Sequence, residues 1–513
     1  MARGGCPAQP HVAKWAAVKA RPASICLLVA FSLPLAACGS GESGASAPGS
    51  AGAAGSSAGG SSGVSADAPT WYGDIAPLVS QHCQSCHTEG GIAPFSLQTY
   101  EQAKLWSGSF DGLLRTGIMP PFLAAETADC KPRFGWKDDL RLSNEQIELF
   151  KSWNDAGCPE GDPELAAALP TPPELELKDA EVSVTIPAPV TIEGPGDKFV
   201  CYSVAPDLTP LAATGAAAAL LGDRVLINAA QIHAGNSAIV HHVLVYTDEA
   251  GQSAALAGDK GYYDCFGGPK LDSPGLLMAW APGATPLTAP EGVAMIVPTK
   301  GRLVIQVHYH PTAEPQVDDA TSLQLRGYGS GIPTYVSTLA LIGNSRTQNT
   351  SGMGLQPGPD DDGQVEFRIP AGAQAHTETM LFPLRANAPE FRVWAVGTHM
   401  HYVGTDMRIG VQRAAPGDEP AEECLLDTPK WDFDWQRGYR YDVPIDQAPS
   451  LTAGDVLNLR CTYDNSLQNP KVAEALAEQG LTAPRDVVLG EETLDEMCLG
   501  IFGMAQKVSD LLK

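Results

Sequence analysis

From about residue 186 to its end, the chain alternates apolar and polar residues in short stretches separated by clusters of Gly, Pro and Asp. RVLINAAQIH, GRLVIQVHYHP and GDVLNLRCTYDN are examples. Alternation with a period of two predicts strands that bury one face, and many short strands predict antiparallel β-sandwiches. Because these roughly 320 residues are many for one sandwich, we expect two, at 186–345 and 346–513.

Only 11 of the 513 residues are histidine, yet histidines cluster three times within these predicted strands. Residues at i and i+2 of a strand share a face, so one metal ion could bind both. Adjacent residues point to opposite faces, so a neighbouring pair needs a distorted strand to share a metal. A surface pair would look the same, but three clusters favour metal ligands. The clustered residues are His241, His242, His308, His310, His399 and His401.

Imidazole binds zinc, copper, iron and nickel, and a thioether ligand beside it would favour copper. The acid-poor surroundings of the clusters argue against an iron centre with two histidines and one carboxylate. His233 and His376 have no assigned role. For His310, a place behind His308 or on the surface is favoured over replacing His308 as a ligand.

The N-terminal part contains Cys83-Gln84-Ser85-Cys86-His87, a C-x-x-C-H sequence. The two thiols can form thioethers with haem vinyl groups, and His87 can bind the iron. A disulfide or half of a zinc site would share the C-x-x-C spacing, but no second C-x-x-C is present to complete a zinc site. Met119, before two prolines, resembles the Met-Pro segment of monohaem cytochromes c and is the expected sixth ligand. His82 lies too close to the motif to reach the opposite haem face.

These features predict a small all-α cytochrome c domain at 69–162, followed by a linker at 163–185 rich in Pro, Ala and Glu. A capping box at Ser143–Gln146 and apolar residues at helical spacing predict its last helix. Among the cysteines, Cys130 with Cys158 and Cys201 with Cys265 are candidate disulfides. Cys424 has no obvious partner.

Residues 1–38 read as an export signal: a cationic region precedes an apolar run that is too short to span a bilayer. The run ends in Leu-Ala-Ala-Cys and resembles the lipobox of bacterial lipoproteins, which predicts lipidation of Cys38. Ordinary secretory cleavage near Ala37 is the alternative. Residues 39–68 are mostly Gly, Ser and Ala, as in a flexible linker. We therefore expect an exported bacterial lipoprotein, periplasmic or anchored at the outer membrane or cell surface, where disulfides are stable.

The chain carries 59 acidic against 33 basic residues, a formal net charge of −26. Such a charge repels nucleic acid and anionic lipid headgroups. We expect no nucleic-acid partner and contact with a membrane only through the lipid anchor.

Four motifs in order resemble the copper type II, ascorbate-dependent monooxygenases, which include peptidylglycine α-hydroxylating monooxygenase and dopamine β-monooxygenase. The family's adjacent histidine pair matches VHHVLVY, and its third histidine matches VHY. Its His-x-His pair matches GTHMH, and its final methionine matches ETLDEMCLG. LRCTYDN resembles the strand that carries a disulfide partner and suggests a pair between Cys461 and Cys498. The matched positions are His241, His242, His308, His399, His401 and Met497.

The resemblance implies two jelly-roll domains, each with one copper ion, facing a solvent-filled cleft. His241, His242 and His308 would hold the copper that stores the second electron. His399, His401 and Met497 would hold the copper that binds dioxygen. The implied reaction inserts one oxygen atom into a C–H bond of a small-molecule substrate and reduces the other to water, with ascorbate or another electron donor as reductant.

The chain departs from the peptide-hydroxylating members at their substrate-binding positions. Gly397 replaces an arginine, Leu499 an asparagine and Ile501 a tyrosine, so no carboxylate clamp and no peptide amidation is expected. The aromatic run at 431–441 is interpreted as a strand with packed aromatics, rather than a pocket lining. The substrate stays open.

The fused cytochrome suggests that electrons reach the copper ions through its haem, since tethering raises the effective concentration of a donor. The predicted cofactors are thus two copper ions and one haem c. A non-catalytic copper and haem redox-relay lipoprotein is the alternative function.

Overall fold

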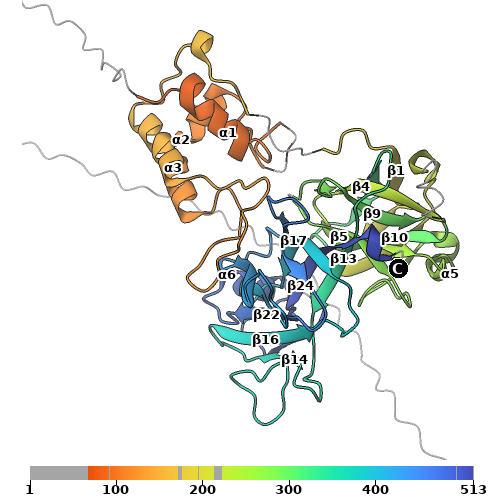
Figure 1. Ribbon diagram of the computed structural model, residues 1–513. Coiled ribbons are helices and arrows are strands. Elements are labelled where there is room, and N and C mark those ends of the chain that lie inside the picture. The colour runs from red at the N-terminus through yellow and green to blue at the C-terminus, as the bar shows by residue number, and fades with distance from the viewer. Residues whose placement is uncertain are drawn as a thin grey trace, which may run out of the picture. The chain divides into compact units, whose positions relative to one another are not determined.

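The computed structural model describes residues 68–89, 91, 93–170, 176–194, 196–212, 222–282, 284–492 and 494–511 (Figure 1). The predicted signal peptide with Cys38, and the linker up to residue 67, lie outside the described residues. Among the described residues, none of the helices combines the length and apolar character needed to cross a lipid bilayer.

The described N-terminal part is helical. Its elements are η1 (Trp71–Ile75), α1 (Ala76–His82), α2 (Tyr100–Thr116) and α3 (Asn144–Asp155), followed by the short turn η2 (Pro163–Leu165). The predicted capping box at the start of α3 is confirmed, because Ser143 and Gln146 each accept a backbone hydrogen bond from the other. The three α-helices bury Phe110, Phe150 and Trp153 in one small core.

The rest of the described chain is mostly β-sheet in several sheets, as expected for β-sandwich architecture. The strands of the first half are β1 (Val182–Thr185), β2 (Val190–Ile192), β3 (Lys198–Val204), β4 (Arg224–His233), β5 (Val240–Asp248), β6 (Tyr262–Asp264), β7 (Gly275–Trp280), β8 (Leu287–Thr288), β9 (Val293–Pro298), β10 (Arg302–Tyr309), β11 (Gln316–Asp318), β12 (Ser322–Gly327) and β13 (Tyr335–Gly343). Its short helical elements are η3 (Thr209–Leu211), α5 (Gln252–Ala257) and η4 (Gly258–Lys260).

The strands of the second half are β14 (Gly354–Leu355), β15 (Arg368–Ile369), β16 (His376–Pro383), β17 (Phe391–His399), β18 (Gly404–Gln412), β19 (Glu422–Thr428), β20 (Gly438–Arg440), β21 (Ser450–Leu451), β22 (Val456–Tyr463), β23 (Val487–Val488) and β24 (Leu499–Lys507). Its helices are α6 (Pro470–Glu478) and α7 (Val508–Leu511). A five-stranded sheet runs in the order β14-β16-β22-β18-β19, and β17 and β24 belong to the large sheet.

One sheet passes from the first half of the β-rich part into the second. β13 pairs antiparallel with β24, and β24 pairs antiparallel with β17, so the three strands lie side by side (Figure 1). The predicted boundary at 345/346 falls just after β13, yet the hydrogen-bonded sheet is continuous there. The buried apolar residues nevertheless form one core for 182–325 and another centred on 355–502. Two cores therefore share a sheet between them.

The segment 122–140 leaves the helical core and packs on the C-terminal one. Phe122, Trp136 and Leu140 are buried among residues of the second half. Trp136 stacks on Tyr441 with ring centroids 5.0 Å apart. The predicted cytochrome domain at 69–162 is thus divided between two cores.

This path makes the predicted disulfide between Cys130 and Cys158 wrong. Cys130 is bonded to Cys424, whereas Cys158 has a free thiol buried in the helical core. The reason is the excursion of 122–140, which carries Cys130 to β19. The predicted disulfides Cys201–Cys265 and Cys461–Cys498 are confirmed.

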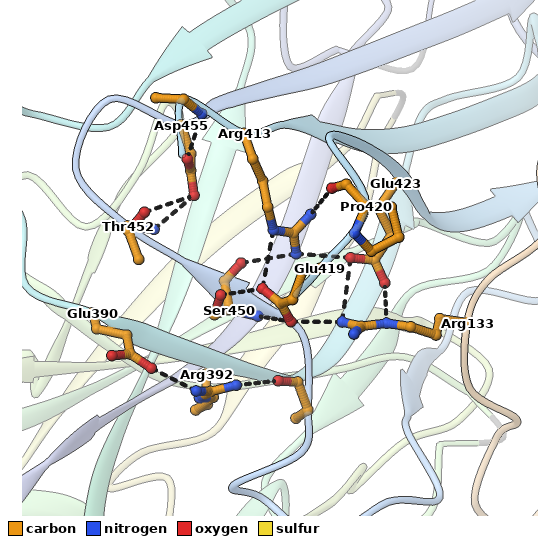
Figure 2. Close-up of polar contacts among 12 residues, drawn as sticks. Arg133, Glu390, Arg392, Arg413, Glu419, Pro420, Glu423, Ser450, Thr452 and Asp455 are labelled. Carbon is orange, nitrogen blue, oxygen red and sulfur yellow. Dashed lines mark hydrogen bonds and ion pairs between the residues drawn. The ribbon is translucent and has the colours of Figure 1, made fainter. Parts of the chain in front are cut away.

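Buried ion pairs hold the same segment to the C-terminal sandwich. Figure 2 shows Arg413 lying between Glu419 and Glu423, with Arg133 on the other side of both carboxylates. Arg413 is 2.7 Å from Glu423 and 3.0 Å from Glu419, and its side chain is 2% exposed. Arg133 is 2.7 Å from Glu419 and 2.8 Å from Glu423. Each carboxylate therefore joins an arginine of the sandwich to an arginine of the segment.

Replacing Glu423 by Ala should lower the free energy of unfolding by about 3–5 kcal/mol, because it leaves Arg133 and the buried Arg413 with one carboxylate, Glu419, between them. The measurement is urea unfolding of the oxidised chain. Glu422→Ala, at the exposed neighbouring position, is the control and should change stability by less than about 0.5 kcal/mol. Equal stability of the two variants would contradict the structural role of the ion pairs.

Candidate metal centre

Three histidines of β5 and β10 point one ring nitrogen each at a common position. The Nδ1 atoms of His241 and His242 are 3.1 Å apart, and the Nδ1 atoms of His308 and His242 are 3.3 Å apart. His308 pairs with His242, whereas the next residue, Tyr309, pairs with Val240. His241 is therefore the extra residue of a β-bulge. The predicted distortion of this strand is confirmed, and it lets adjacent histidines converge.

This arrangement suits a metal ion better than protons. Two nitrogens at these distances can share one proton, but the single lone pair on Nδ1 of His242 cannot accept a full hydrogen bond from both His241 and His308. Burial lowers the pKa of His241 and His242 well below the usual range, and the nearby His308 lowers both further. Both rings are therefore neutral, the form that binds metals. Among the described residues, these three form the one group of His, Cys, Asp or Glu side chains with at least three possible ligand atoms all within 4.8 Å of one another.

Asp197 lies behind this group and was missed in the sequence. Its carboxylate is 3.3 Å from Nε2 of His308 and 2.9 Å from Nδ1 of His310. Only the contact with His310 is a hydrogen bond, because Nε2 of His308 has no hydrogen-bond partner among the described residues. His310 therefore lies beside Asp197, behind His308. Only the register of β3 with β10, which sets Phe199 opposite His308, brings Asp197 there.

The second predicted set lines one cavity of about 380 Å³, together with His242 and His308. β17 ends at His399, so His401 lies in the following turn rather than in the strand, and the two rings are 5.4 Å apart. Met497 lines the same cavity. Met400 is fully buried in the C-terminal core, as expected for a side chain that points away from the two histidines.

The outer nitrogens of this second set already have partners. Nδ1 of His399 lies 2.6 Å from the side-chain oxygen of Gln436, and Nδ1 of His401 lies 3.1 Å from the carbonyl oxygen of Asp495. Each ring thus keeps Nε2 for another ligand. Burial lowers the pKa of His399 to about 4 and that of His401 to about 3. Both rings are neutral at physiological pH.

The two sets of histidines lie close together. The ring centroids of His242 and His399 are 5.9 Å apart. The segment 431–441 contains both a packed aromatic side chain and residues that line the cavity. Phe433 is buried and stacks on His241 at 4.5 Å, whereas Gln436, Arg437 and Arg440 line the cavity.

The C-x-x-C-H segment follows α1. The backbone N–H of His87 donates to the carbonyl of Cys83, and Nδ1 of His87 lies 3.1 Å from the carbonyl oxygen of Phe95. This contact leaves Nε2 of His87 for another partner. Cys86 has a free thiol, as has Cys83.

Met119, the predicted sixth haem ligand, follows α2 and is half-buried. Its backbone N–H donates to the carbonyl of Leu113. His82 is buried, and its Nδ1 lies 2.9 Å from the carbonyl oxygen of Leu140. The role of Met119 stays a prediction.

No protein-family model matches the chain, and no curated protein matches it. Among solved structures, the tandem CBM22-1-CBM22-2 domain of Paenibacillus barcinonensis Xyn10C aligns over 64% of this chain and 99% of its own, with 10% identity and a TM-score of 0.14. The infectious bursal disease virus Gx strain structure aligns over 66% and 76%, with 8% identity and a TM-score of 0.16. Likenesses this weak carry no argument about fold or function.

Replacing His242 by Ala should weaken Cu(II) binding at the three-nitrogen group by at least about tenfold, because it removes the nitrogen nearest to both others. Chelator competition during a copper titration measures the affinity. His310→Ala is the control, since that ring lies beyond Asp197, and its effect should be much smaller. A His242→Ala variant that binds as tightly as the parent chain would contradict the assignment.

Proposed function

We propose that the chain is a copper-dependent monooxygenase that hydroxylates a C–H bond of a small-molecule substrate with O2. The observation that carries this proposal is the convergence of the Nδ1 atoms of His241, His242 and His308 beside a cavity that also contains a second histidine pair and a methionine. The resemblance to the copper monooxygenases assigns the same residues in the same order.

The donor atoms favour copper over other metals. His241, His242 and His308 would hold one copper ion. His399, His401 and Met497 would hold the other. A thioether among imidazoles favours Cu(I), and the carboxylate of Asp197 lies on the outer side of His308 rather than among the facing nitrogens. Bound copper would supply one-electron redox chemistry, so that one substrate C–H bond, O2, two electrons and two protons yield one hydroxylated product and one water.

The chain's own residues shape the space next to these ligands. Leu341, Leu499 and Ile501 line the cavity from β13 and β24. Two of these positions carry polar substrate contacts in the peptide-hydroxylating members. Their apolar side chains here favour a substrate with an apolar body over a peptide carboxylate.

Cys83, Cys86, His87 and Met119 would hold the haem c of the proposed electron-supplying domain. Cys86 lines a small cavity together with Trp435, Gln436 and Arg437. Gln436 is also the residue whose side-chain oxygen contacts His399. This proximity supports electron delivery by the fused domain, while ascorbate or another donor would reduce that domain from solution.

The compartment follows from the cysteines and the N-terminal sequence. The three disulfides favour an extracellular or periplasmic location, because such bonds are rare in a reducing cytosol. Anchoring as a bacterial lipoprotein through Cys38 is part of the proposal.

Oxygen consumption coupled to a hydroxylated product tests the function, with a library of apolar small molecules as substrates. Met497→Ala should abolish both signals, because it removes the soft ligand of the proposed O2 site. Met353→Ala, in a loop that does not line the cavity, should leave them unchanged. A copper-loaded parent chain that yields no oxygen-dependent product would instead support the redox-relay alternative.

Replacing His87 by Ala should slow the reduction of bound copper by a reduced donor by about tenfold or more, since it removes the advantage of a tethered donor. Stopped-flow absorbance of the copper-loaded, haem-loaded chain measures this rate. His233→Ala, at the end of β4, is the control. Unchanged reduction kinetics in the His87 variant would contradict electron delivery through the haem.

A further inference from the structure

Glu496 is a fully buried carboxylate that the proposed mechanism does not use. Its side chain is 0% exposed, and it accepts four backbone hydrogen bonds. Oε2 accepts from the N–H groups of His401 and Met497, both at 2.7 Å. Oε1 accepts from Val403 at 3.2 Å and from Gly404 at 3.1 Å.

Within the described part of the chain, no arginine, lysine or histidine forms an ion pair with Glu496. Four backbone N–H groups, in place of a cation, face its two oxygens. Burying a carboxylate costs several kcal/mol, and these backbone N–H groups are its compensation. A glutamine, leucine or methionine at this position would avoid that cost. The backbone N–H groups that the carboxylate binds therefore give the reason for a glutamate here.

The four N–H groups belong to two separate segments. One is the turn after β17, which carries His401. The other contains Met497, two residues before the start of β24. Asp495 holds the His401 side chain from the same side, through its carbonyl oxygen. The backbone and the ring of His401 are therefore both held by the pair of residues that immediately precedes Met497.

The outer contacts of these segments are also fixed. Trp431 donates from its indole nitrogen to the carbonyl of His401, and the hydroxyl of Tyr463 donates to the carbonyl of Met497. At Gly404, an added Cβ would lie 2.8 Å from Cβ of Met400, so only glycine brings this N–H to the carboxylate without displacing the turn. The backbone on both sides of the Glu496 carboxylate is therefore fixed by further contacts.

We propose that Glu496 is a positioning residue that sets His401 and Met497 at the spacing needed to bind one metal ion. The proposal rests on the proposed function, because it takes these two residues as ligands of the same copper. It does not make Glu496 a ligand, since both of its oxygens face backbone N–H groups.

Glu496→Gln tests this directly on the full chain loaded with Cu(I). Glutamine keeps the shape but offers one oxygen, and its NH2 group then faces N–H donors, so the two segments should separate. We expect the copper–sulfur scattering in the X-ray absorption spectrum to disappear. Affinity for the second copper should fall about 10–100-fold, the usual effect of losing an outer partner of a metal ligand. Copper at His241, His242 and His308 should stay bound with the parent affinity.

Glu491→Gln is the matched control: it is another glutamate of the same loop, it lines the cavity, and it accepts one backbone hydrogen bond, from Gly267. This variant should keep the copper–sulfur signal. Glu496→Asp retains the carboxylate on a shorter side chain, and its affinity for the second copper should fall between those of the parent chain and Glu496→Gln. Thermal unfolding of each metal-free variant shows whether it folds.

Parent-like copper–sulfur scattering and affinity in the folded Glu496→Gln variant would overturn the proposal and leave the proposed function standing. Should Glu496→Gln fail to fold, parent-like affinity in Glu496→Asp would overturn it equally. Equal weakening of both copper sites in a folded variant would also overturn it, because a positioning role predicts loss at one site. A parent chain without copper–sulfur scattering would overturn the proposed function itself, and this proposal with it.

Discussion

Three imidazole nitrogens that face one another constrain the rest of this site. The single lone pair on Nδ1 of His242 cannot accept a full hydrogen bond from both His241 and His308, and burial keeps the rings of His241 and His242 neutral. The convergence requires the bulge in β5, which in turn requires pairing with β10 in one fixed register. Phe433 and Phe199 stack on the outer faces of His241 and His308 and hold these rings in place.

The continuous sheet then brings the second set of residues to the first. β13 belongs to the large sheet of the first half and pairs with β24, which begins two residues after Met497. β24 in turn pairs with β17, which ends at His399. Two sandwiches joined only by a flexible linker would leave this spacing to domain motion. Here the backbone hydrogen bonds of β13, β24 and β17 fix the spacing between the two sets. Glu496 fixes the turn after β17 through its own hydrogen bonds to that turn.

The sequence predicted the parts of the site that depend on local pattern. Period-two alternation predicted the strands that carry the histidines, the adjacent pair predicted a distorted strand, and the capping box predicted the start of α3. What failed depended on the path of the chain in space. The pairing of Cys130 could not be predicted, because nothing local shows that 122–140 crosses to the C-terminal core. Asp197 and Glu496 were missed for a related reason: each contacts a predicted ligand more than ninety residues away in sequence.

The central claim, that two copper ions occupy these two sets of residues, is tested most directly by diffraction from crystals of the copper-loaded chain. Anomalous difference maps recorded on both sides of the copper absorption edge locate each ion. The account predicts two copper peaks per chain, one within bonding distance of the Nδ1 atoms of His241, His242 and His308 and one beside His399, His401 and Met497. A single copper peak, or peaks away from these residues, would contradict it.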